Sequence, residues 1–379
     1  MISRRKTLAL IGGGLIVAAG SGAYAVTRTP KGALKPWDMA GSYQDPRMRA
    51  LSWAILSPNP HNRQPWKVDL SEPDQVQLFV DTDRLLPHTD PFSRQIVIGL
   101  GCFLETLKIA AAEDGYDLDV DLFPQGFDPV ALDDRPVAQI AFLAAQANPD
   151  PDFALLPERR TQKEPYDLQR AVSDAALRDL ESSVKYGSRI GTTNDMDRVQ
   201  QMRALSGEAL RIEIETPHTY KESVDLFRIG RAEVDANPDG IDFTGPMFET
   251  LHLTGQFSRE IALDQSSMAY QAGLDAVMEN TRTAMGHVWL VTEGNSRVDQ
   301  INVGRDWMRL NLATTRAGLG IQPLSQALQE YPEMSELYAK IHKDLAAPGE
   351  TVQMWARLGY CAPVPPSPRW PLDAKIMNA

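Results

Sequence analysis

The sequence predicts an α+β fold, with helices and strands mixed in both halves of the chain. Residues 92–114 form a long apolar run without proline, which predicts a buried helix. Residues 117–123 alternate strictly between polar and apolar side chains, which predicts a strand. Residues 146–152 are polar and contain prolines, so they mark the boundary between two lobes.

Periodicity places the remaining elements along the chain. Apolar residues recur at helical spacing in residues 45–56, 173–185, 194–214 and 297–317. Strand patterns cover residues 76–80, 137–144, 286–292 and 351–359. The tripeptide Gly-Leu-Gly stands beside a long helix at 99–101 and again at 318–320, and this echo hints at an internal duplication.

Composition and charge exclude several classes of protein. The chain has 379 residues, with 38 basic and 50 acidic side chains and a formal net charge of -12. Without a basic excess it is not expected to bind a nucleic-acid backbone, because such binding depends on releasing counterions from phosphates. Two cysteines cannot build a disulfide framework or a Cys-rich zinc site. The length leaves ample chain for two lobes.

The first 25 residues have the pattern of a targeting segment. Arg4 and Arg5 precede a glycine-rich apolar run at residues 8–22, and residues 23–25 have the A-x-A spacing of a signal-peptidase site. The pattern resembles a twin-arginine export signal, so we expect a periplasmic or exported protein that uses the twin-arginine export machinery. That route carries folded proteins, often with a cofactor already loaded. A retained membrane anchor and an ordinary cytosolic terminus are the alternatives.

Common catalytic signatures are missing from the sequence. It contains no H-E-x-x-H, paired C-x-x-C, P-loop or G-x-S-x-G motif, so zinc protease, NTPase and α/β-hydrolase chemistry have no basis in it. The six histidines are scattered without a pair at ligand spacing, and no metal site is expected. Cys102 lies in an apolar helix and is interpreted as a buried thiol.

The most informative segment is residues 56–67, which follow a predicted helix stop. Ser57, His61, Asn62 and Gln64 present hydroxyl, imidazole and amide groups on a backbone restricted by prolines. Such a loop suits a polar, planar ligand rich in hydrogen-bonding groups. The alternative is a well-capped turn in which these side chains serve their own backbone.

Residues 57–66 read Ser-Pro-Asn-Pro-His-Asn-Arg-Gln-Pro-Trp and resemble the P-S-x-x-N-x-Q-P-W signature of the FMN-dependent nitroreductases, in particular their double-lobed, Acg-like branch. Three further matches follow in order. Residues 90–101 resemble the segment downstream of the signature, and residues 159–163 resemble the R-R-[ST]-x-R element that binds flavin phosphate. Residues 318–324 and 357–369 resemble the closing motifs. Together the matches span about residues 45–372.

The order of these motifs implies a fused pseudo-dimer. Nitroreductases of this family are homodimers with FMN at the interface, whereas here the loop lies in the first half and the phosphate elements lie in the second. We expect a tether at 26–44, a first lobe at 45–150, a second lobe at 151–379 that holds the phosphate site, and one FMN per chain. The resemblance also implies a monomer in solution.

The resemblance assigns roles to individual residues. The residues assigned to the cofactor are Ser57, His61, Asn62, Gln64, Arg160, Thr161, Lys163, Gly320, Gln322 and Arg369. Arg160, Lys163 and Arg369 would bind the terminal phosphate, although Lys163 departs from the arginine of the family and a solvated surface role is the alternative for all three. The hydroxyls and amides would face the phosphate, the ribityl chain or the ring edge, and the backbone at 320–322 would donate toward the flavin.

Three functions are compatible with the sequence. The first is an FMN oxidoreductase that reduces a nitroaromatic, a quinone or a similar small-molecule acceptor, with His61 as a candidate proton donor and no other catalytic side chain. The second is a non-catalytic, sequestering FMN binder, in which residues 228–247 form a lid. The third is an exported ligand-binding scaffold without flavin. Access to the flavin would separate the first two.

Overall fold

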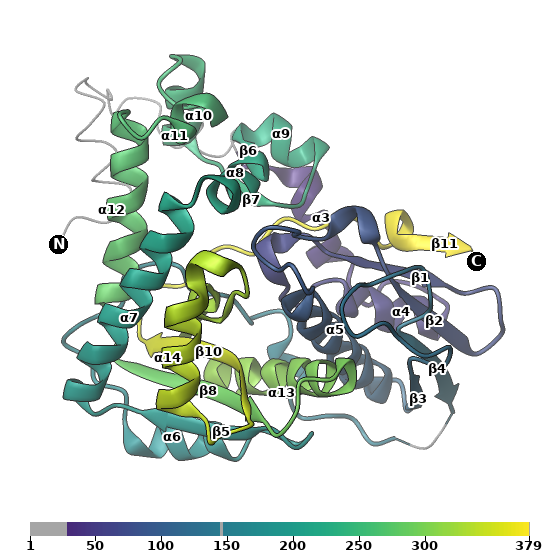
Figure 1. Ribbon diagram of the computed structural model, residues 1–379. Helices are drawn as coiled ribbons and strands as arrows, with labels where there is room; N and C mark the ends of the chain where they lie inside the picture. Colours follow the sequence, from purple (N-terminus) through teal and green to yellow (C-terminus); the bar gives the residue numbers. More distant parts are fainter. Residues whose placement is uncertain (1–28, 145–146, 379) are drawn as a thin grey trace.

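The structure is a computed structural model that describes residues 29–144 and 147–378. The predicted export segment at residues 1–25 lies outside the described residues. The described chain forms two lobes, each with a sheet of four antiparallel strands and one long helix, and the first sheet gains a parallel fifth strand from the C-terminal tail. The two long helices meet between the sheets (Figure 1). The predicted α+β class is therefore confirmed.

The first lobe contains the sheet with the strand order β11-β1-β2-β4-β3. Its elements are α4 (Pro46–Ala54), β1 (Trp66–Asp69), β2 (Gln75–Val80), α5 (Arg94–Glu113), β3 (Asp117–Leu122) and β4 (Ala138–Leu143). Side chains alternate between buried and partly exposed along β2 and β4, because one face of the sheet packs on α5. Among the described helices, only α5 is long and apolar enough to cross a membrane, and it is buried in the protein core.

The second lobe contains the sheet with the strand order β5-β8-β10-β9. Its elements are α6 (Asp174–Glu181), β5 (Arg189–Thr193), β8 (Gly286–Thr292), α13 (Arg297–Arg316), β9 (Gly320–Pro323), α14 (Ser335–Leu345) and β10 (Thr351–Gly359). The strands of each lobe, apart from β11, follow one plan. The first and second strands form an antiparallel pair, a 20-residue helix follows, and the fourth strand pairs with the second and the third. The duplication is thus visible in topology.

The two long helices cross at a pair of equivalent glycines. Gly101 and Gly304 each lie seven residues after the first residue of their helix. A Cβ on Gly101 would lie 2.1 Å from the carbonyl oxygen of Ile301, and one on Gly304 would lie 2.0 Å from the carbonyl oxygen of Ile98. The reciprocal contact requires glycine at both positions. Gly304, not the tripeptide at 318–320, is therefore the structural counterpart of Gly101, which corrects the echo expected from the sequence.

A helical insertion separates β5 from β8 and projects beyond the two sheets (Figure 1). Its elements are α7 (Met196–Glu215), α8 (Pro217–Asp225), β6 (Phe227–Ile229), α9 (Gly230–Ala236), β7 (Ile241–Phe243), α10 (Pro246–Leu253), α11 (Arg259–Leu263) and α12 (Met268–Arg282). Buried aromatic residues from β6, β7 and the segment before α11 give the insertion a small core of its own. The sequence predicted α7 but not the elements after it.

Both ends of the described chain pack on the boundary between the lobes. Residues Lys31–Met39 form helix α3, where the sequence led us to expect a tether. The helix forms despite Pro36 because Ala33 and Pro36 are buried and Asp235 accepts a hydrogen bond from the amide of Ala33 at 3.0 Å. The C-terminal tail leaves the second lobe and ends in β11 (Ile376–Asn378), which pairs with β1 of the first lobe. The end of the chain therefore belongs to the sheet of the first lobe, although the sequence predicts that all of residues 151–379 belong to the second lobe.

Candidate functional site

The loop at residues 57–64 has a strained backbone that its own side chains hold in place. His61, Asn62 and Gln64 have positive φ angles of 47°, 52° and 51°, a region that residues other than glycine rarely adopt. The side-chain oxygen of Asn59 accepts a hydrogen bond from the amide of Gln64 at 2.7 Å, and its nitrogen donates to the carbonyl of Ser57 at 3.1 Å. Strain of this kind concentrates at functional sites.

Gln64 joins the loop to two distant segments. Its side chain is fully buried and donates to the carbonyl of Pro238 in the insertion at 2.7 Å. Its side-chain oxygen accepts from the amide of Trp370 at 2.9 Å, and its carbonyl accepts from Nζ of Lys375 at 2.8 Å. Gln64 therefore fixes the C-terminal tail and the insertion on the loop.

Arg369 of the tail lies against the loop and is only 3% exposed. One guanidinium nitrogen donates to Oδ1 of Asn62 at 2.6 Å, and the other donates to the carbonyls of Leu56 and Ser57 at 3.0 and 3.1 Å. Burial, followed by the positive charges of Arg159 and Arg160, lowers the pKa of Arg369 to about 9. The protein therefore holds this cation beside two other cations, and the carboxylate of Asp242 opposes their effect only in part.

The segment at 159–163 brings further cations to the same place. Arg159 is 4% exposed, and burial followed by Arg160 lowers its pKa to about 10. The guanidinium of Arg160 lies 4.7 Å from the ring centroid of Trp37, and that of Arg369 lies 5.8 Å from the same ring. We call Arg159, Arg160, Lys163, Arg369 and His61 the cationic site.

His61 contributes a neutral imidazole to the cationic site. Burial lowers its pKa to about 4, with further lowering by Lys163 and by Arg63. The same charges that disfavour a proton on His61 would attract an anion. Lys163 itself is exposed, so a contact between its ammonium group and a ligand costs little desolvation.

Four buried nitrogen atoms of the cationic site have no hydrogen-bond partner among the residues that the structure describes. They are Nδ1 of His61, Nη1 of Arg159, Nε of Arg160 and Nε of Arg369. Unsatisfied buried polar groups are costly, and each calls for an explanation such as a ligand. Clustered guanidinium donors match the geometry of a phosphate, so the residues fit a phosphate-bearing cofactor. Within the described ranges, no group of side chains could hold a metal ion.

The remaining predicted residues lie near the cationic site but have other contacts. Ser57 turns its hydroxyl toward α5, donating to Oγ1 of Thr106 at 2.7 Å, and only its carbonyl faces Arg369. Thr161 is half-buried within the 159–163 segment. Gln322 accepts a hydrogen bond from Nε of Arg357 at 2.6 Å.

Gly320 lies in β9 opposite Gly359 of β10, and its small size has a structural reason. A Cβ at Gly320 would lie 2.8 Å from the Tyr166 ring and 3.1 Å from the side chain of Gln162. Because the amide of Gln162 donates to the carbonyl of Ile321 at 2.9 Å, β9 is adjacent to the 159–163 segment. The flavin-facing roles of Gly320 and Gln322 stay predictions.

The sequence predicted residues 228–247 as a lid, but it singled out neither Asp239 of the insertion nor Trp37 of α3. Asp239 is 4% exposed and forms salt bridges with Arg63, Arg84 and Arg228. The amide of the next residue, Gly240, donates to the carbonyl of Asn62 at 3.3 Å. Trp37 lies in a segment rich in proline and glycine, and no periodic pattern marked it. For Arg159 the doubled arginine was the available signal.

Comparisons with known proteins agree with the motif reading. No family model matches the sequence. The Mycobacterium tuberculosis protein named "Putative NAD(P)H nitroreductase acg" is 26% identical over 339 residues, covering 86% of this chain and 93% of that protein. "Putative NAD(P)H nitroreductase Rv3131" of the same organism is 23% identical over 340 residues, covering 86% and 89%. These similarities support a nitroreductase-like family.

The chain is also similar to a solved structure. The "putative nitroreductase" from Anabaena variabilis shares 11% identity with it, covers 87% of this chain and 91% of its own, and has a TM-score of 0.38.

Proposed function

We propose that the protein is an FMN-dependent oxidoreductase of the nitroreductase type and that the cationic site holds the terminal phosphate of FMN. The observation that carries the proposal is the set of four buried nitrogen atoms, from three segments far apart in sequence, that lack a hydrogen-bond partner in the described part of the chain. The names of the relatives, which include NAD(P)H nitroreductases, favour the same chemistry. Arg160, Lys163 and Arg369 would neutralise the phosphate charge.

When bound, FMN would supply the two-electron chemistry that reduces a nitroaromatic, a quinone or a similar acceptor. The chain's own residues would orient the cofactor and shield it from solvent. Asn62 is held between Arg369 and the carbonyl of Pro368, to which its nitrogen donates at 3.0 Å, so its amide has a fixed direction. His61, whose pKa burial lowers to about 4, is a neutral imidazole at neutral pH and holds no imidazolium proton to donate there. A proton for the product would then come from water.

A second function, a sequestering FMN binder, is favoured by the closure of residues 238–240 on the loop. Asp239, Gly240 and the carbonyl of Pro238 all contact residues of the loop at 57–64. A segment held by three arginine partners opens less readily than an ordinary surface loop. In this reading the segment predicted as a lid keeps acceptors from the flavin.

Reconstitution separates the possibilities. Purified protein would be loaded with FMN, reduced with dithionite or NADPH, and mixed with a nitroaromatic or a naphthoquinone. Reoxidation with product formation supports the oxidoreductase, whereas a flavin that bleaches with dithionite but reduces no acceptor supports the sequestering binder. A colourless protein that takes up no FMN contradicts both.

The phosphate assignment has its own test. Arg160→Ala combined with Arg369→Ala should reduce FMN retention on gel filtration at least 100-fold, because two charge-assisted contacts are lost. The control is Arg135→Ala, an exposed arginine paired with Asp133 away from the site, which should retain FMN. Undiminished retention in the double variant refutes the assignment.

Export through the twin-arginine pathway belongs to the same proposal. It rests on residues 1–25 of the sequence alone. Arg4→Lys with Arg5→Lys should trap the chain in the cytoplasm, and cell fractionation against the unaltered chain checks this. An unchanged distribution rules the pathway out.

A further inference from the structure

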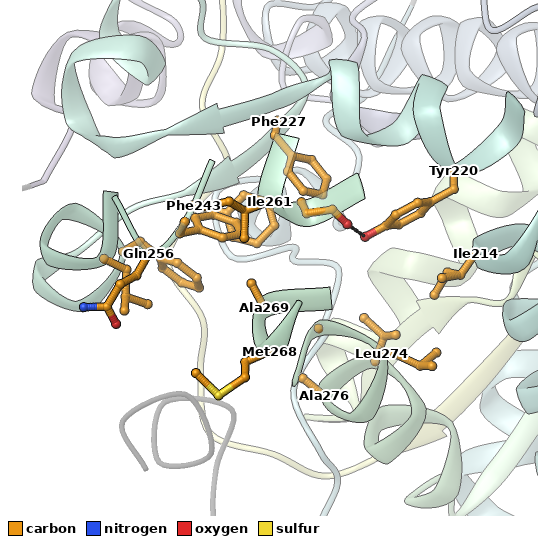
Figure 2. A pocket seen from close by; sticks show the side chains of 16 residues that line it. Ile214, Tyr220, Phe227, Phe243, Gln256, Ile261, Met268, Ala269, Leu274 and Ala276 are labelled. Atoms are coloured by element: carbon orange, nitrogen blue, oxygen red, sulfur yellow. Dashed lines mark hydrogen bonds between the residues drawn. The ribbon is translucent and has the colours of Figure 1, made fainter. Parts of the chain in front are cut away.

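The insertion contains an apolar cavity that the cationic site does not use. Its volume is about 330 Å³, within the range of small-molecule sites. Phe227 and Phe243 lie on one side of it, and Leu274 and Ala276 of the helix α12 lie on the other (Figure 2). Phe248 and Phe257 also line the cavity and contact Phe243. The cavity is therefore built by β6, β7 and the helices α7, α8 and α10 to α12 together.

Among the described residues, almost no polar group faces this cavity. The hydroxyl of Tyr220 is already bonded to the carbonyl of Ala262 at 3.0 Å, as the dashed line in Figure 2 shows. Gln256, whose amide lies at the rim, is the remaining polar side chain among the lining residues. Apolar cavities without polar partners do not hold ordered water well and accept hydrocarbon ligands instead. An occupant would restore the dispersion contacts that the lining now lacks.

The cavity lies one strand away from the cationic site. Successive side chains of a strand point to opposite faces, so Asp242 and Phe243 of β7 face different environments. Phe243 lines the cavity, whereas the charge of Asp242 acts on Arg369. The β6–β7 pair thus has one face toward the loop and the tail and the other toward the cavity.

We propose that the insertion binds an uncharged, largely hydrocarbon molecule with an aromatic ring system in this cavity, held by the phenylalanine cluster and the α12 wall. Aromatic rings arranged at 4.6 to 6.4 Å from one another offer edge and face contacts to a further ring. Charged ligands are excluded because nothing in the lining would compensate their desolvation. The site does not require that FMN be bound.

Gly273 of α12 provides a way to close the cavity without disturbing its walls. It is an exposed residue of the cavity lining, its φ is ordinary, and an added Cβ would meet no described atom within 4 Å. Gly273→Phe should therefore fill the space, whereas Gly273→Ala adds one methyl group and serves as the matched control. Leu253→Gln removes an apolar side chain that is 70% exposed and is not part of the lining, which tests for adsorption to the surface.

The experiment titrates the full chain with N-phenyl-1-naphthylamine, an uncharged probe that fluoresces in apolar surroundings. We expect saturable binding of one probe per chain, unchanged within twofold in Gly273→Ala and Leu253→Gln, and weakened at least tenfold in Gly273→Phe. Ala269→Phe, which fills the cavity from another lining position, should repeat the loss if Gly273→Phe does not fold. Three results would overturn the proposal: no saturable binding of the probe by the unaltered chain, binding by both Gly273→Phe and Ala269→Phe that is as tight as in the unaltered chain, or loss of binding in Leu253→Gln. If the unaltered chain binds no probe and is a dimer, whereas Gly273→Phe is a monomer, the cavity holds a second copy of the chain. That result would also overturn the proposal.

Discussion

Arg369 carries a buried positive charge that its own contacts only partly satisfy. Its partners are the Asn62 side chain and backbone carbonyls, and Nε has none within the described part of the chain. Burying a cation is costly without an opposite charge, and Arg159 and Arg160 add to that cost. An anion at the cationic site would offset the cost of burying Arg369 and the repulsion from both Arg159 and Arg160. The site is therefore poised to gain stability from a ligand phosphate.

His61 gives this electrostatic argument a test in pH. Its pKa is about 4 when folded and near 6.5 when unfolded, so between these values the unfolded chain binds a proton that the folded chain does not. The stability present above pH 6.5 is therefore lost as the pH falls toward 4, by at most roughly 3 kcal/mol. His61→Asn, which tolerates positive φ, should weaken this decline in urea unfolding between pH 7 and 4.

The same variant defines the contrary outcome. His287, also buried with a pKa lowered to about 3, contributes a decline of the same sign, so it is the difference between wild type and variant that counts. If the free energy of unfolding falls equally with pH in the wild type and in His61→Asn, the pKa of His61 is not lowered by folding. In the presence of inorganic phosphate, the pKa of His61 measured by NMR should rise, because an anion offsets the charges of Lys163 and Arg63.

At the scale of elements, α3 closes the cationic site through Trp37. The ring covers Arg160, its Nε1 donates to the carbonyl of Ser367 at 2.8 Å, and the carbonyl of Ala33 accepts from the amide of Arg369 at 2.8 Å. Trp37→Ala should release the tail and speed hydrogen exchange of the Arg369 amide, with a loss of about 1–2 kcal/mol. Trp37→Phe keeps the ring and should show the smaller part of that effect. If the exchange rate of the Arg369 amide is unchanged in Trp37→Ala, the contacts with the loop at 57–64 hold the tail without help from α3.

The elements with strong periodicity were predictable from the sequence, and those formed by tertiary contact were not. The helix predicted at 297–317 is α13, and the strand predicted at 286–292 is β8 with the same bounds. β6, β7 and β11 each have three residues, too few for a pattern to appear. Within the site, Asn62 meets Arg369 across more than 300 residues. Only the family motifs placed the two together, since spacing carries no such information.

The crossing of α5 and α13 makes a sharp prediction about packing. Gly101→Ala would place a methyl group against backbone atoms of α13, which cannot rotate away as a side chain can. The helices must separate, and we expect a loss of about 1–3 kcal/mol in unfolding free energy, or more. Gly273→Ala is the matched control, because its Cβ meets open space and alanine favours a helix by about 1 kcal/mol. Equal stability of the two variants would contradict the crossing as described.

At the scale of the whole molecule, the duplicated fold is chemically asymmetric. The loop at 182–188 precedes β5 as the loop at 57–64 precedes β1. In the second lobe the carboxylate of Asp306 accepts hydrogen bonds from the amides of Lys185, Tyr186 and Ser188 at 2.5, 2.8 and 3.1 Å. An internal carboxylate thus occupies donors that could otherwise serve an external anion. The two related loops therefore differ in the charge that they can accept.

The surroundings of the second loop reinforce this asymmetry. Arg305 donates to the hydroxyl of Tyr186 at 2.9 Å and, with Arg309, forms salt bridges with Glu105, whose side chain is fully buried. Both of these guanidinium groups form a salt bridge with a carboxylate, whereas Arg369 forms none within the described ranges. A phosphate would have to displace these acids and leave them buried without compensation, which is strongly unfavourable.

We therefore expect one FMN per chain, bound at the cationic site. Equilibrium dialysis against FMN, with chain concentration from amino-acid analysis, should saturate at a ratio of about one. Arg160→Ala with Arg369→Ala should lower the ratio toward zero over the same concentration range, whereas Asp306→Asn should leave it near one because Glu105 still pairs with the neighbouring arginines. A ratio near two in the unaltered chain would mean that both halves of the duplicated fold kept a cofactor site. If the double arginine variant still binds one FMN per chain, the FMN site lies at the loop at 182–188 and not at the cationic site.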